Sequence, residues 1–167
     1  IVEAAVAELG RLDYLVNNAG TPVSREPVPF KDLDRIDDAF WDRILETNLV
    51  GMFRCIRAAA PHLKQTRGAV VNLASVAGFN FGIGSSVPYA ASKAGVINLT
   101  RNLSLALAPD VRVNAVAPGL IDTPMTAPMA AFPEIMDAEL ARIPMGRTGR
   151  PEEIAAAVLF LSSAAAA

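Results

Sequence analysis

The sequence predicts an α/β protein built on a doubly wound parallel sheet. Short apolar runs at 13–17, 69–73 and 111–116 have the length and composition of buried strands. Longer segments with apolar residues at helical spacing separate these runs. Strands that alternate with helices pair in parallel through right-handed crossovers, so helices are expected on both faces of the sheet.

Local signals assign the first elements in order. Residues 1–9 have the apolar spacing of a helix, and Gly10 stands where a left-handed C-terminal cap is usual. The run 13–17 is the first expected strand. The loop that follows it is rich in proline, at Pro22, Pro27 and Pro29.

A long helix is expected next, capped by Asp37 or Asp38. The second strand, 69–73, follows this helix. A helix of mainly small residues is expected from Tyr89 to about Ala108. The third strand, 111–116, then ends at Pro118 and Gly119.

The C-terminal part is expected to hold an irregular segment and one more helix. Residues 122–145 are rich in proline and methionine and are expected to form a loop or a helical excursion. Pro151, Glu152 and Glu153 are a good helix start, because proline suits the first turn and acids suit the positive end of the helix dipole. This helix should continue through Leu161.

The two ends of the sequence suggest a piece of a longer protein. No capping residue precedes Ile1, although residues 1–9 already show a helical apolar stripe. No closing strand follows the last expected helix. We therefore expect an incomplete sheet that lacks N-terminal strands and a last strand.

Composition fits one globular domain and limits its partners. The 167 residues carry 15 Lys and Arg against 17 Asp and Glu, for a formal charge of −2. This balance gives no support for a nucleic-acid or anionic-membrane surface. With 52% hydrophobic and 19% charged residues, global disorder is excluded. No apolar run approaches the roughly 20 residues of a membrane span, so no membrane partner is expected.

The single Cys55 and single His62 limit the chemistry further. One cysteine cannot form an internal disulfide and suits a reducing, cytoplasmic compartment. The pair leaves too few soft ligands for a zinc site, so no metal is expected. His62 fits a cation near a helix C-terminus better than a catalytic base, which disfavours a Ser-His-Asp hydrolase.

Ligands of doubly wound sheets bind at the carboxyl ends of the strands, which directs attention to 18–20, 74–78 and 118–123. Tyr89 and Lys93 are four residues apart on an expected helix, so they share one face. A nearby ammonium can bring the pKa of a phenol down from its reference value of about 10, which would make Tyr89 a usable acid or base. The alternative is an ordinary surface pair.

Ser75 follows the second strand at its carboxyl end, where a hydroxyl can donate to a substrate carbonyl oxygen. Its alternative role is to cap the turn 75–78. Asn48 lies in the middle of a helix, where asparagine is a weak helix former. It could hold a water or bend the helix, or it could occupy an ordinary exposed position.

The motifs together resemble the short-chain dehydrogenase/reductase family, most closely its 3-oxoacyl-carrier-protein reductase-like subgroup. The resemblance covers essentially the whole chain and rests on motifs in the family's order. These are Asn17-Asn18-Ala19-Gly20, Asn48, Asn72-Leu73-Ala74-Ser75, Tyr89-Ala90-Ala91-Ser92-Lys93, Pro118-Gly119-Leu120-Ile121-Asp122-Thr123 and Gly146-Arg147-Thr148-Gly149-Arg150-Pro151-Glu152-Glu153-Ile154-Ala155.

The resemblance implies a Rossmann-like fold, and residues 1–167 would be the C-terminal two-thirds of the family's catalytic domain. It implies hydride transfer between NAD or NADP and a carbonyl or alcohol substrate. Tyr89 would be the acid or base, Lys93 would lower its pKa and bind the cofactor ribose, Ser75 would hold the substrate oxygen, and Asn48 would keep a relay water. Cofactor contacts are implied for Asn18, Ala19, Gly20, Tyr89, Lys93, Pro118, Gly119, Ile121 and Thr123. A scaffold without turnover, which serves as a binding or assembly partner, is the alternative.

The sequence departs from the family in one respect. The glycine-rich diphosphate turn that follows the family's first strand has no counterpart here, so the choice between NAD and NADP is not readable. The favoured explanation is a fragment of a longer family member, and the alternative is a naturally shortened chain that keeps the catalytic residues but cannot bind the diphosphate. The segment Phe81–Gly84 is interpreted instead as a substrate-side loop.

Two further expectations concern the substrate and the assembly. Met125, Met129, Phe132, Met136 and Met145 lie in 122–145, either as an adaptable apolar lid that favours a partly apolar ketone or alcohol, or as core of a small helix pair. Small residues at Gly51, Ala58, Ala91, Ala94 and Gly95 are expected on helix surfaces. In the family the matching helices form the interface of a homodimer, commonly within a homotetramer.

Overall fold

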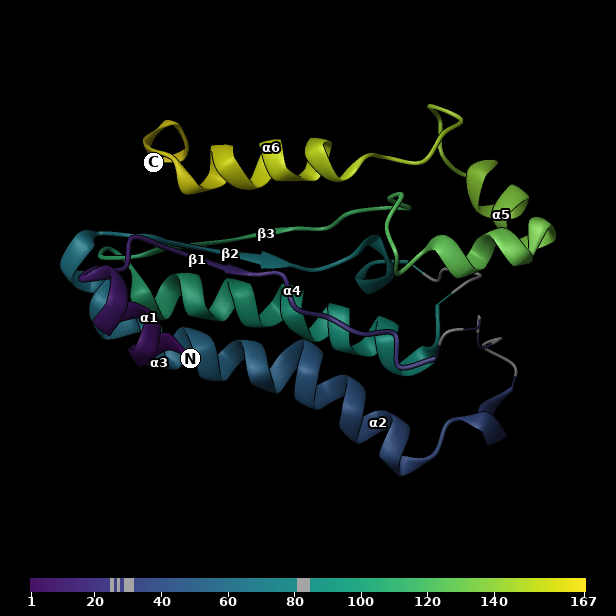
Figure 1. Cartoon of the computed structure of the whole chain (residues 1–167), viewed down its shortest axis with the longest axis horizontal. Helices are drawn as coiled ribbons and strands as arrows, with labels where there is room; N and C mark the ends of the chain where they lie inside the picture. The colour runs from purple at the N-terminus through teal and green to yellow at the C-terminus, as the bar shows by residue number, and fades with distance from the viewer. Residues whose placement is uncertain (25, 27, 29–31, 81–84) are drawn as a thin grey trace.

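The computed structural model describes residues 1–24, 26, 28, 32–80 and 85–167 (Figure 1). Two features expected from the sequence, the prolines at 27 and 29 and the segment 81–84, lie outside the described residues. In chain order the elements are α1 (Val2–Leu9), β1 (Tyr14–Asn17), α2 (Asp38–Leu45), a π-helical segment (Glu46–Val50), α3 (Gly51–Thr66), β2 (Ala69–Leu73), α4 (Val87–Leu107), β3 (Arg112–Val116), α5 (Pro133–Leu140) and α6 (Pro151–Ser162). Short 3-10 turns lie at Leu33–Arg35, Val76–Gly78, Ala127–Ala131 and Ala164–Ala166.

The strands form a parallel sheet in the order β1-β2-β3. Tyr14 pairs with Ala69, and Ala69 in turn pairs with Arg112. β2 is central, and all five of its residues are buried. The predicted parallel pairing is therefore confirmed, and the carboxyl ends of the strands meet at one edge of the sheet.

Helices cover the sheet on both faces, as expected for a doubly wound fold. α3 and α4 pack on one face, and α6 packs on β2 and β3 from the other (Figure 1). The chain changes face after β3, because α6 follows that strand on the opposite side from α4. α1 lies beside α3, so the two chain ends are on opposite sides of the sheet.

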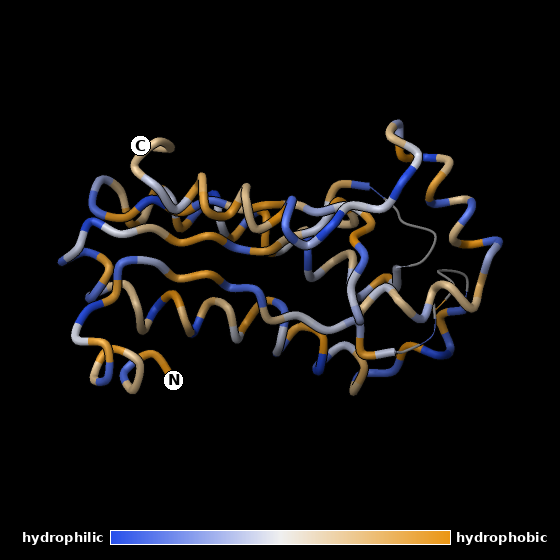
Figure 2. Tube along the Cα trace, turned by 45° about the horizontal axis from the view of Figure 1, so that its top comes forward, coloured by the Kyte–Doolittle hydropathy of each residue, from blue (hydrophilic) through white to orange (hydrophobic). Residues whose placement is uncertain are grey.

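The main core lies between the sheet and α3 and α4. Figure 2 shows hydrophobic stretches along the strands and along the helix faces that meet them. Ile56, Leu63, Val70 and Val96 have exposed fractions of 1% or less, so water is excluded from this layer. A smaller cluster of Val28, Phe40 and Ile44 packs near the start of α4.

Several helix ends follow the local signals of the sequence. Gly10 adopts φ 78°, the left-handed conformation expected of a C-terminal cap. The Asp37 side chain accepts a hydrogen bond from the Phe40 N–H at 2.8 Å, which starts α2. Ser86 caps α4 in the same way, and α6 begins at Pro151 as predicted.

The one long helix expected after Asp37 is interrupted by a π-helical segment at Glu46–Val50. The Gly51 N–H donates to the Glu46 carbonyl at the end of this segment. A Cβ at Gly51 would lie 2.9 Å from the Glu46 oxygen, so a residue without a side chain permits the wider turn. The lack of a side chain at Gly51 is therefore explained by the turn of its own helix.

Gly95 is half-buried and contacts the neighbouring helical segment. A Cβ there would lie 3.0 Å from Leu49 Cδ2, so Gly95 allows close packing of α4 on the π-helical segment. Ala91 and Ala94 are exposed as expected, and Ala58 is half-buried.

The irregular segment after β3 begins and ends at two backbone positions that are joined by hydrogen bonds. Ile121 and Gly149 form a parallel bridge, in which the Asp122 N–H donates to the Gly149 carbonyl and the Gly149 N–H donates to the Leu120 carbonyl, both at 2.9 Å. The intervening residues form the turn Ala127–Ala131 and α5, which confirms a helical excursion. Its ends therefore meet beside the sheet.

Arg112 ties the first residue of β3 to the end of α6. Its guanidinium donates to the carbonyls of Leu161 at 2.8 Å, Ser163 at 3.0 Å, Ser162 at 3.1 Å and Ala166 at 3.3 Å. Carbonyls at a helix C-terminus have no partner within the helix, and a cation is favourable there. No helix in the described part of the chain is both long and apolar enough to cross a membrane.

Candidate active site

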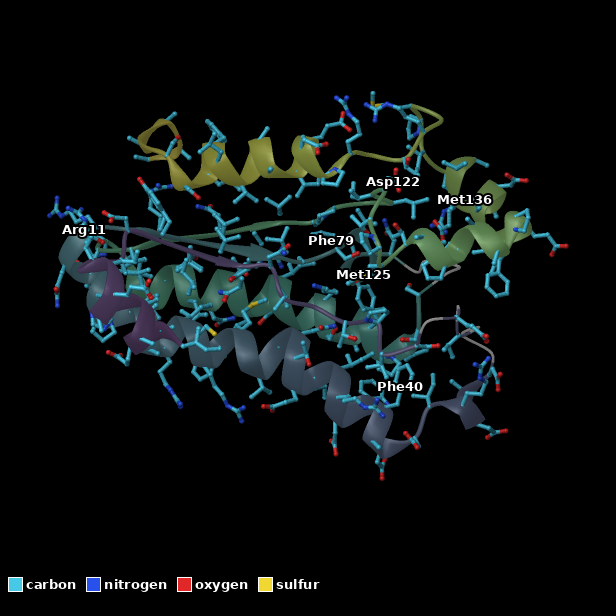
Figure 3. All side chains as sticks on the ribbon, viewed as in Figure 1. Arg11, Phe40, Phe79, Asp122, Met125 and Met136 are labelled. Carbon is cyan, nitrogen blue, oxygen red and sulfur yellow. The ribbon has the colours of Figure 1, made fainter. Side chains whose placement is uncertain are left out.

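A cavity of about 410 Å³ opens where β2 and β3 end. The 3-10 turn after β2, the start of α4 and the helical excursion surround it. Its apolar lining includes Val28, Val76, Leu120, Met125, Met129, Ile143 and Pro144, and its polar lining includes Ser75, Tyr89, Thr126, Glu139 and Arg142. Figure 3 labels Met125 at this end of the sheet. The size falls within the range of about 300–1,000 Å³ that is typical of small-molecule sites.

Tyr89 and Ser75 meet on the wall of this cavity. Both residues line the cavity, although they come from different elements, and the Ser75 hydroxyl lies close enough to the Tyr89 phenol to affect its pKa. Burial raises the pKa of the Tyr89 phenol above its ordinary value, and the neighbouring Ser75 hydroxyl opposes that rise. The expectation of a lowered pKa is therefore not met by this geometry, because burial outweighs the stabilisation of the phenolate.

Lys93 lies one helical turn after Tyr89, with Nζ 5.7 Å from the centre of the Tyr89 ring. Nζ donates to the Leu73 carbonyl at the end of β2, at 2.7 Å. The residue is only 4% exposed, and this burial lowers its pKa to about 8. The alternative of an ordinary surface pair is therefore wrong.

Ser75 also fills the capping role considered for it. Its Oγ accepts a hydrogen bond from the Ala77 N–H at 3.2 Å and starts the turn Val76–Gly78. The two roles are compatible, because the same oxygen faces the Tyr89 phenol while it caps the turn. The cap holds the hydroxyl at a fixed position beside the cavity.

Asn48 is fully buried, so the alternative of an exposed helix position is wrong. Its Oδ1 accepts from the Thr21 N–H at 2.8 Å, and its Nδ2 donates to the Thr21 carbonyl at 3.0 Å and to Ser92 Oγ at 3.1 Å. The π-helical segment turns this side chain inward, and Asn48 thereby joins the loop after β1 to α4.

The loop after β1 reaches the same group of residues through Gly20. A Cβ at Gly20 would lie 3.6 Å from both Asn48 Oδ1 and Lys93 Nζ. Asn18 and Ala19 are exposed, whereas Gly20 is half-buried. Gly20, Asn48 and Lys93 therefore lie next to one another.

Of the residues predicted in the segment after β3, Gly119 lines the cavity, and Pro118, Ile121 and Thr123 lie close to it in the chain. The carbonyl of Pro118 accepts from the Val76 N–H at 3.0 Å. Ile121 forms the bridge that closes the helical excursion. Thr123 lies directly beyond it, at the entrance to the turn Ala127–Ala131.

Thr126, which the sequence did not single out, organises this segment. Its Oγ1 donates to the Ile121 carbonyl at 2.5 Å, accepts from the Thr123 N–H at 3.1 Å and lies 3.2 Å from Thr123 Oγ1. Two threonines three residues apart beside a proline are a signal for such a hydroxyl-capped turn. The cavity residues Val28, Glu139 and Arg142 carried no comparable signal.

The described residues contain no group of three or more His, Cys, Asp or Glu side chains placed to hold a metal ion. The reactive side chains that the described residues bring together here are the Tyr89 phenol, the Lys93 ammonium and the Ser75 hydroxyl. Their arrangement suits proton transfer to or from an oxygen held against Ser75 and Tyr89.

Comparisons with known proteins place the chain in a family. A family model described as enoyl-(acyl carrier protein) reductase matches residues 1–167. The 3-oxoacyl-[acyl-carrier-protein] reductase FabG of Thermotoga maritima is 44% identical over 98% of this chain and 63% of that protein. The cis-4-hydroxycyclohexanecarboxylate dehydrogenase of Sinomonas cyclohexanicum is 42% identical over 99% of this chain and 64% of that protein.

Solved structures agree with these matches. A short-chain dehydrogenase/reductase from Brucella melitensis has a TM-score of 0.83 with 37% identity, over 99% of this chain and 63% of that chain. A 3-oxoacyl-[acyl-carrier protein] reductase from the same organism has a TM-score of 0.82 with 36% identity, over 96% of this chain and 60% of that chain.

The parallel sheet with helices on both faces and these matches define a Rossmann-like fold. The chain belongs to the short-chain dehydrogenase/reductase family, in its 3-oxoacyl-[acyl-carrier-protein] reductase-like subgroup. It spans slightly less than two thirds of the length of the curated relatives described above.

Proposed function

We propose that this chain is the catalytic part of a single Rossmann-like domain that transfers a hydride between NAD or NADP and a carbonyl or alcohol substrate. The observation that carries the proposal is the meeting of Ser75 and Tyr89 on the cavity wall, with Lys93 Nζ 5.7 Å from the Tyr89 ring. Asn48 is buried behind Lys93, next to Gly20. A scaffold without turnover would not need Ser75 and Tyr89 on the cavity wall with a buried lysine beside them.

Tyr89 supplies the proton in the reduction direction. Because burial raises its pKa, the phenol stays protonated at neutral pH, which is the form that can protonate a carbonyl oxygen. Ser75 holds the substrate oxygen through its hydroxyl, at a position fixed by the turn that it caps. In the oxidation direction Tyr89 takes the proton back.

Lys93 and Asn48 support this proton transfer. An ammonium near the ring stabilises the phenolate that remains after Tyr89 has given up its proton. Asn48 Oδ1 and Lys93 Nζ both lie beside Gly20, and a water bound between these polar atoms would carry the next proton to Lys93.

The residues around the cavity fit a nicotinamide cofactor. A Cβ at Gly119 would have no atom within 4 Å, so the backbone there allows close approach of a ligand, and Gly20 places no side chain beside Lys93. Contacts are proposed for Asn18, Ala19, Gly20, Tyr89, Lys93, Pro118, Gly119, Ile121 and Thr123. Such a cofactor supplies the hydride, and the protein supplies position and the proton.

The cavity lining favours a partly apolar substrate. Met125 and Met129 line the wall, and methionine adapts to irregular apolar groups. Met125 and Met145 are 44% and 73% exposed, which disfavours a role as core of a small helix pair. The relatives are named for different substrates, so the proposal commits to the CH–OH/C=O pair and to an apolar neighbouring group.

Assembly and location complete the proposal. We expect a homodimer or homotetramer in the cytoplasm, as the family resemblance implies. Exposed apolar side chains on the helices are consistent with an interface, since Phe53 on α3 is 38% exposed and Leu105 on α4 is 81% exposed.

The test is Tyr89→Phe in the protein at its natural length, assayed with a panel of ketones and alcohols. Loss of the phenol hydroxyl is expected to lower kcat by about a thousandfold, within the range of general acid catalysis, while cofactor affinity measured by calorimetry stays near normal. Tyr14→Phe is the matched control, because Tyr14 is 56% exposed on β1 and makes no part of the cavity. Wild-type rates in Tyr89→Phe would overturn the proposal.

A further inference from the structure

Three polar side chains lie buried between the sheet and α4 without a part in the proposed chemistry. They are Asn17 on β1, Asn72 on β2 and Thr100 on α4, with exposed fractions of 9%, 0% and 7%. Burial of polar groups is unfavourable unless their hydrogen bonds are satisfied, so their arrangement has to be accounted for.

The three residues form a directed chain of hydrogen bonds. Asn17 Nδ2 donates to Asn72 Oδ1 at 2.8 Å, Asn72 Nδ2 donates to Thr100 Oγ1 at 2.9 Å, and Thr100 Oγ1 donates to the Val96 carbonyl at 2.7 Å. Because the Asn72 oxygen is bonded to Asn17, its amide nitrogen faces Thr100. Because the Thr100 hydroxyl donates along its own helix, its oxygen accepts from Asn72.

The buried face of α4 is half polar. It consists of Pro88, Ser92, Lys93, Val96, Thr100 and Leu107. An apolar face alone can slide against a sheet at little cost, whereas a buried polar pair is satisfied at one position only. Ser92–Asn48, Lys93–Leu73 and Thr100–Asn72 are the polar contacts that fix α4, and only the last lies outside the proposed site.

The Asn72–Thr100 contact is close in sequence to both reactive contacts. Leu73, whose carbonyl accepts from Lys93 Nζ, directly follows Asn72, and Ser75 is two residues further on. Thr100 lies two helical turns after Lys93 on the same helix. A shift of α4 along β2 would therefore change the Lys93 and Tyr89 contacts together.

We propose that Thr100 is a positioning residue: its bond with Asn72 fixes α4 along β2 and so places Lys93 at the Leu73 carbonyl and Tyr89 at Ser75. The link to turnover rests on the proposed function. The link to the position of Lys93 does not, and it can be measured separately.

The experiment compares Thr100→Val with Thr100→Ser in the protein at its natural length. Valine keeps the shape and removes the acceptor for Asn72, whereas serine keeps the hydroxyl. Thr66→Val is the matched control, because Thr66 Oγ1 donates to the Leu12 carbonyl at 2.8 Å at the far end of α3. The measurements are melting temperature, kcat, KM and the side-chain ammonium resonance of Lys93 in protein labelled with ¹⁵N-lysine.

Thr100→Val is expected to lower kcat by about tenfold or more with little change in KM, because a small misplacement of reacting groups is costly. It is also expected to shift or broaden the Lys93 resonance, observed below the Lys93 pKa of about 8. Thr100→Ser should retain both properties. Thr66→Val should lower only the melting temperature.

Equal kcat and an unchanged Lys93 resonance in Thr100→Val would overturn the proposal, as would equal losses in all three variants. If Thr100→Val does not fold, Thr100→Ala takes its place with the same expectation. If the wild-type protein shows no turnover, the proposed function fails, and the Lys93 resonance alone decides the positioning role.

Discussion

Burial of the Lys93 amine lowers the stability of the native state at neutral pH. Burial lowers the pKa of Lys93 from 10.5 to about 8, and between these values the unfolded chain holds a proton that the native state has lost. Since the unfolded state then binds more protons, the free energy of unfolding rises with pH across this window. This lowering of the Lys93 pKa corresponds to a change of roughly 3 kcal/mol in the free energy of unfolding across the window.

We therefore predict that Lys93→Met flattens the pH dependence of stability. Urea unfolding of the wild-type protein between about pH 7.5 and 9.5 should give a rising free energy, and the difference between wild type and Lys93→Met should change by about 2 kcal/mol over this range. The range stays below pH 10, because the raised pKa of Tyr89 acts in the opposite direction above that value. If the difference in the free energy of unfolding between the two proteins stays constant with pH, burial does not lower the Lys93 pKa.

The residues of the site divide into those with a local signal and those without one. Tyr89, Lys93 and Ser75 could be predicted, because helical spacing and the end of a strand are readable from the sequence alone. Asn48 could not be resolved, since its burial depends on Thr21 and Ser92, which are distant in the chain. Thr100 was missed for the same reason, because its partner Asn72 lies on another element.

At the scale of elements, the strand and helix assignments followed from apolar runs and capping residues. All three strands and the starts of α2 and α6 agree with the expectations to within about two residues, the usual uncertainty of element ends. The π-helical segment was not predicted. Its hydrogen bond from the Gly51 N–H to the Glu46 carbonyl is visible only once the helix is built.

The contact between Arg112 and the end of α6 yields a prediction about stability. Arg112→Met removes four hydrogen bonds to helix carbonyls, and the free energy of unfolding should fall by about 2–3 kcal/mol, since hydrogen bonds to charged groups are among the stronger ones. Denaturant unfolding measures the change.

Arg54→Met is the control for that measurement. Arg54 pairs with Glu46 on the surface, where both side chains are more than half exposed, so the loss should stay within about 0.5 kcal/mol. Equal effects of the two substitutions would indicate that Arg112 acts only as a surface charge.

At the scale of the whole molecule, the sheet leaves apolar surface uncovered beside β1. Tyr14 and Val16 are 56% and 44% exposed, because α6 packs on β2 and β3. Within the described part of the chain, β1 pairs on one side only, with β2. Leu159 and Phe160 on α6 add further exposed apolar area, at 71% and 53%.

A polypeptide of these 167 residues alone is therefore predicted to associate through β1 and to bind NADH weakly or not at all. Light scattering should report growing particles, and calorimetry should report no tight binding. Val16→Lys should reduce the association, because a charge on an edge strand opposes pairing. Leu105→Lys adds the same charge on α4, and an equal reduction there would trace the effect to net charge instead of to β1.

The bridge between Ile121 and Gly149 has a consequence for how this fold can diversify. The 27 residues from 122 to 148 leave and rejoin the framework at two hydrogen-bonded neighbours. Their number and sequence can therefore change while β3 and α6 stay in place. Under the proposed function, the cavity-lining residues of this segment contact the organic group of the substrate, so a transplanted cassette with the same two anchor points is expected to change the substrate preference.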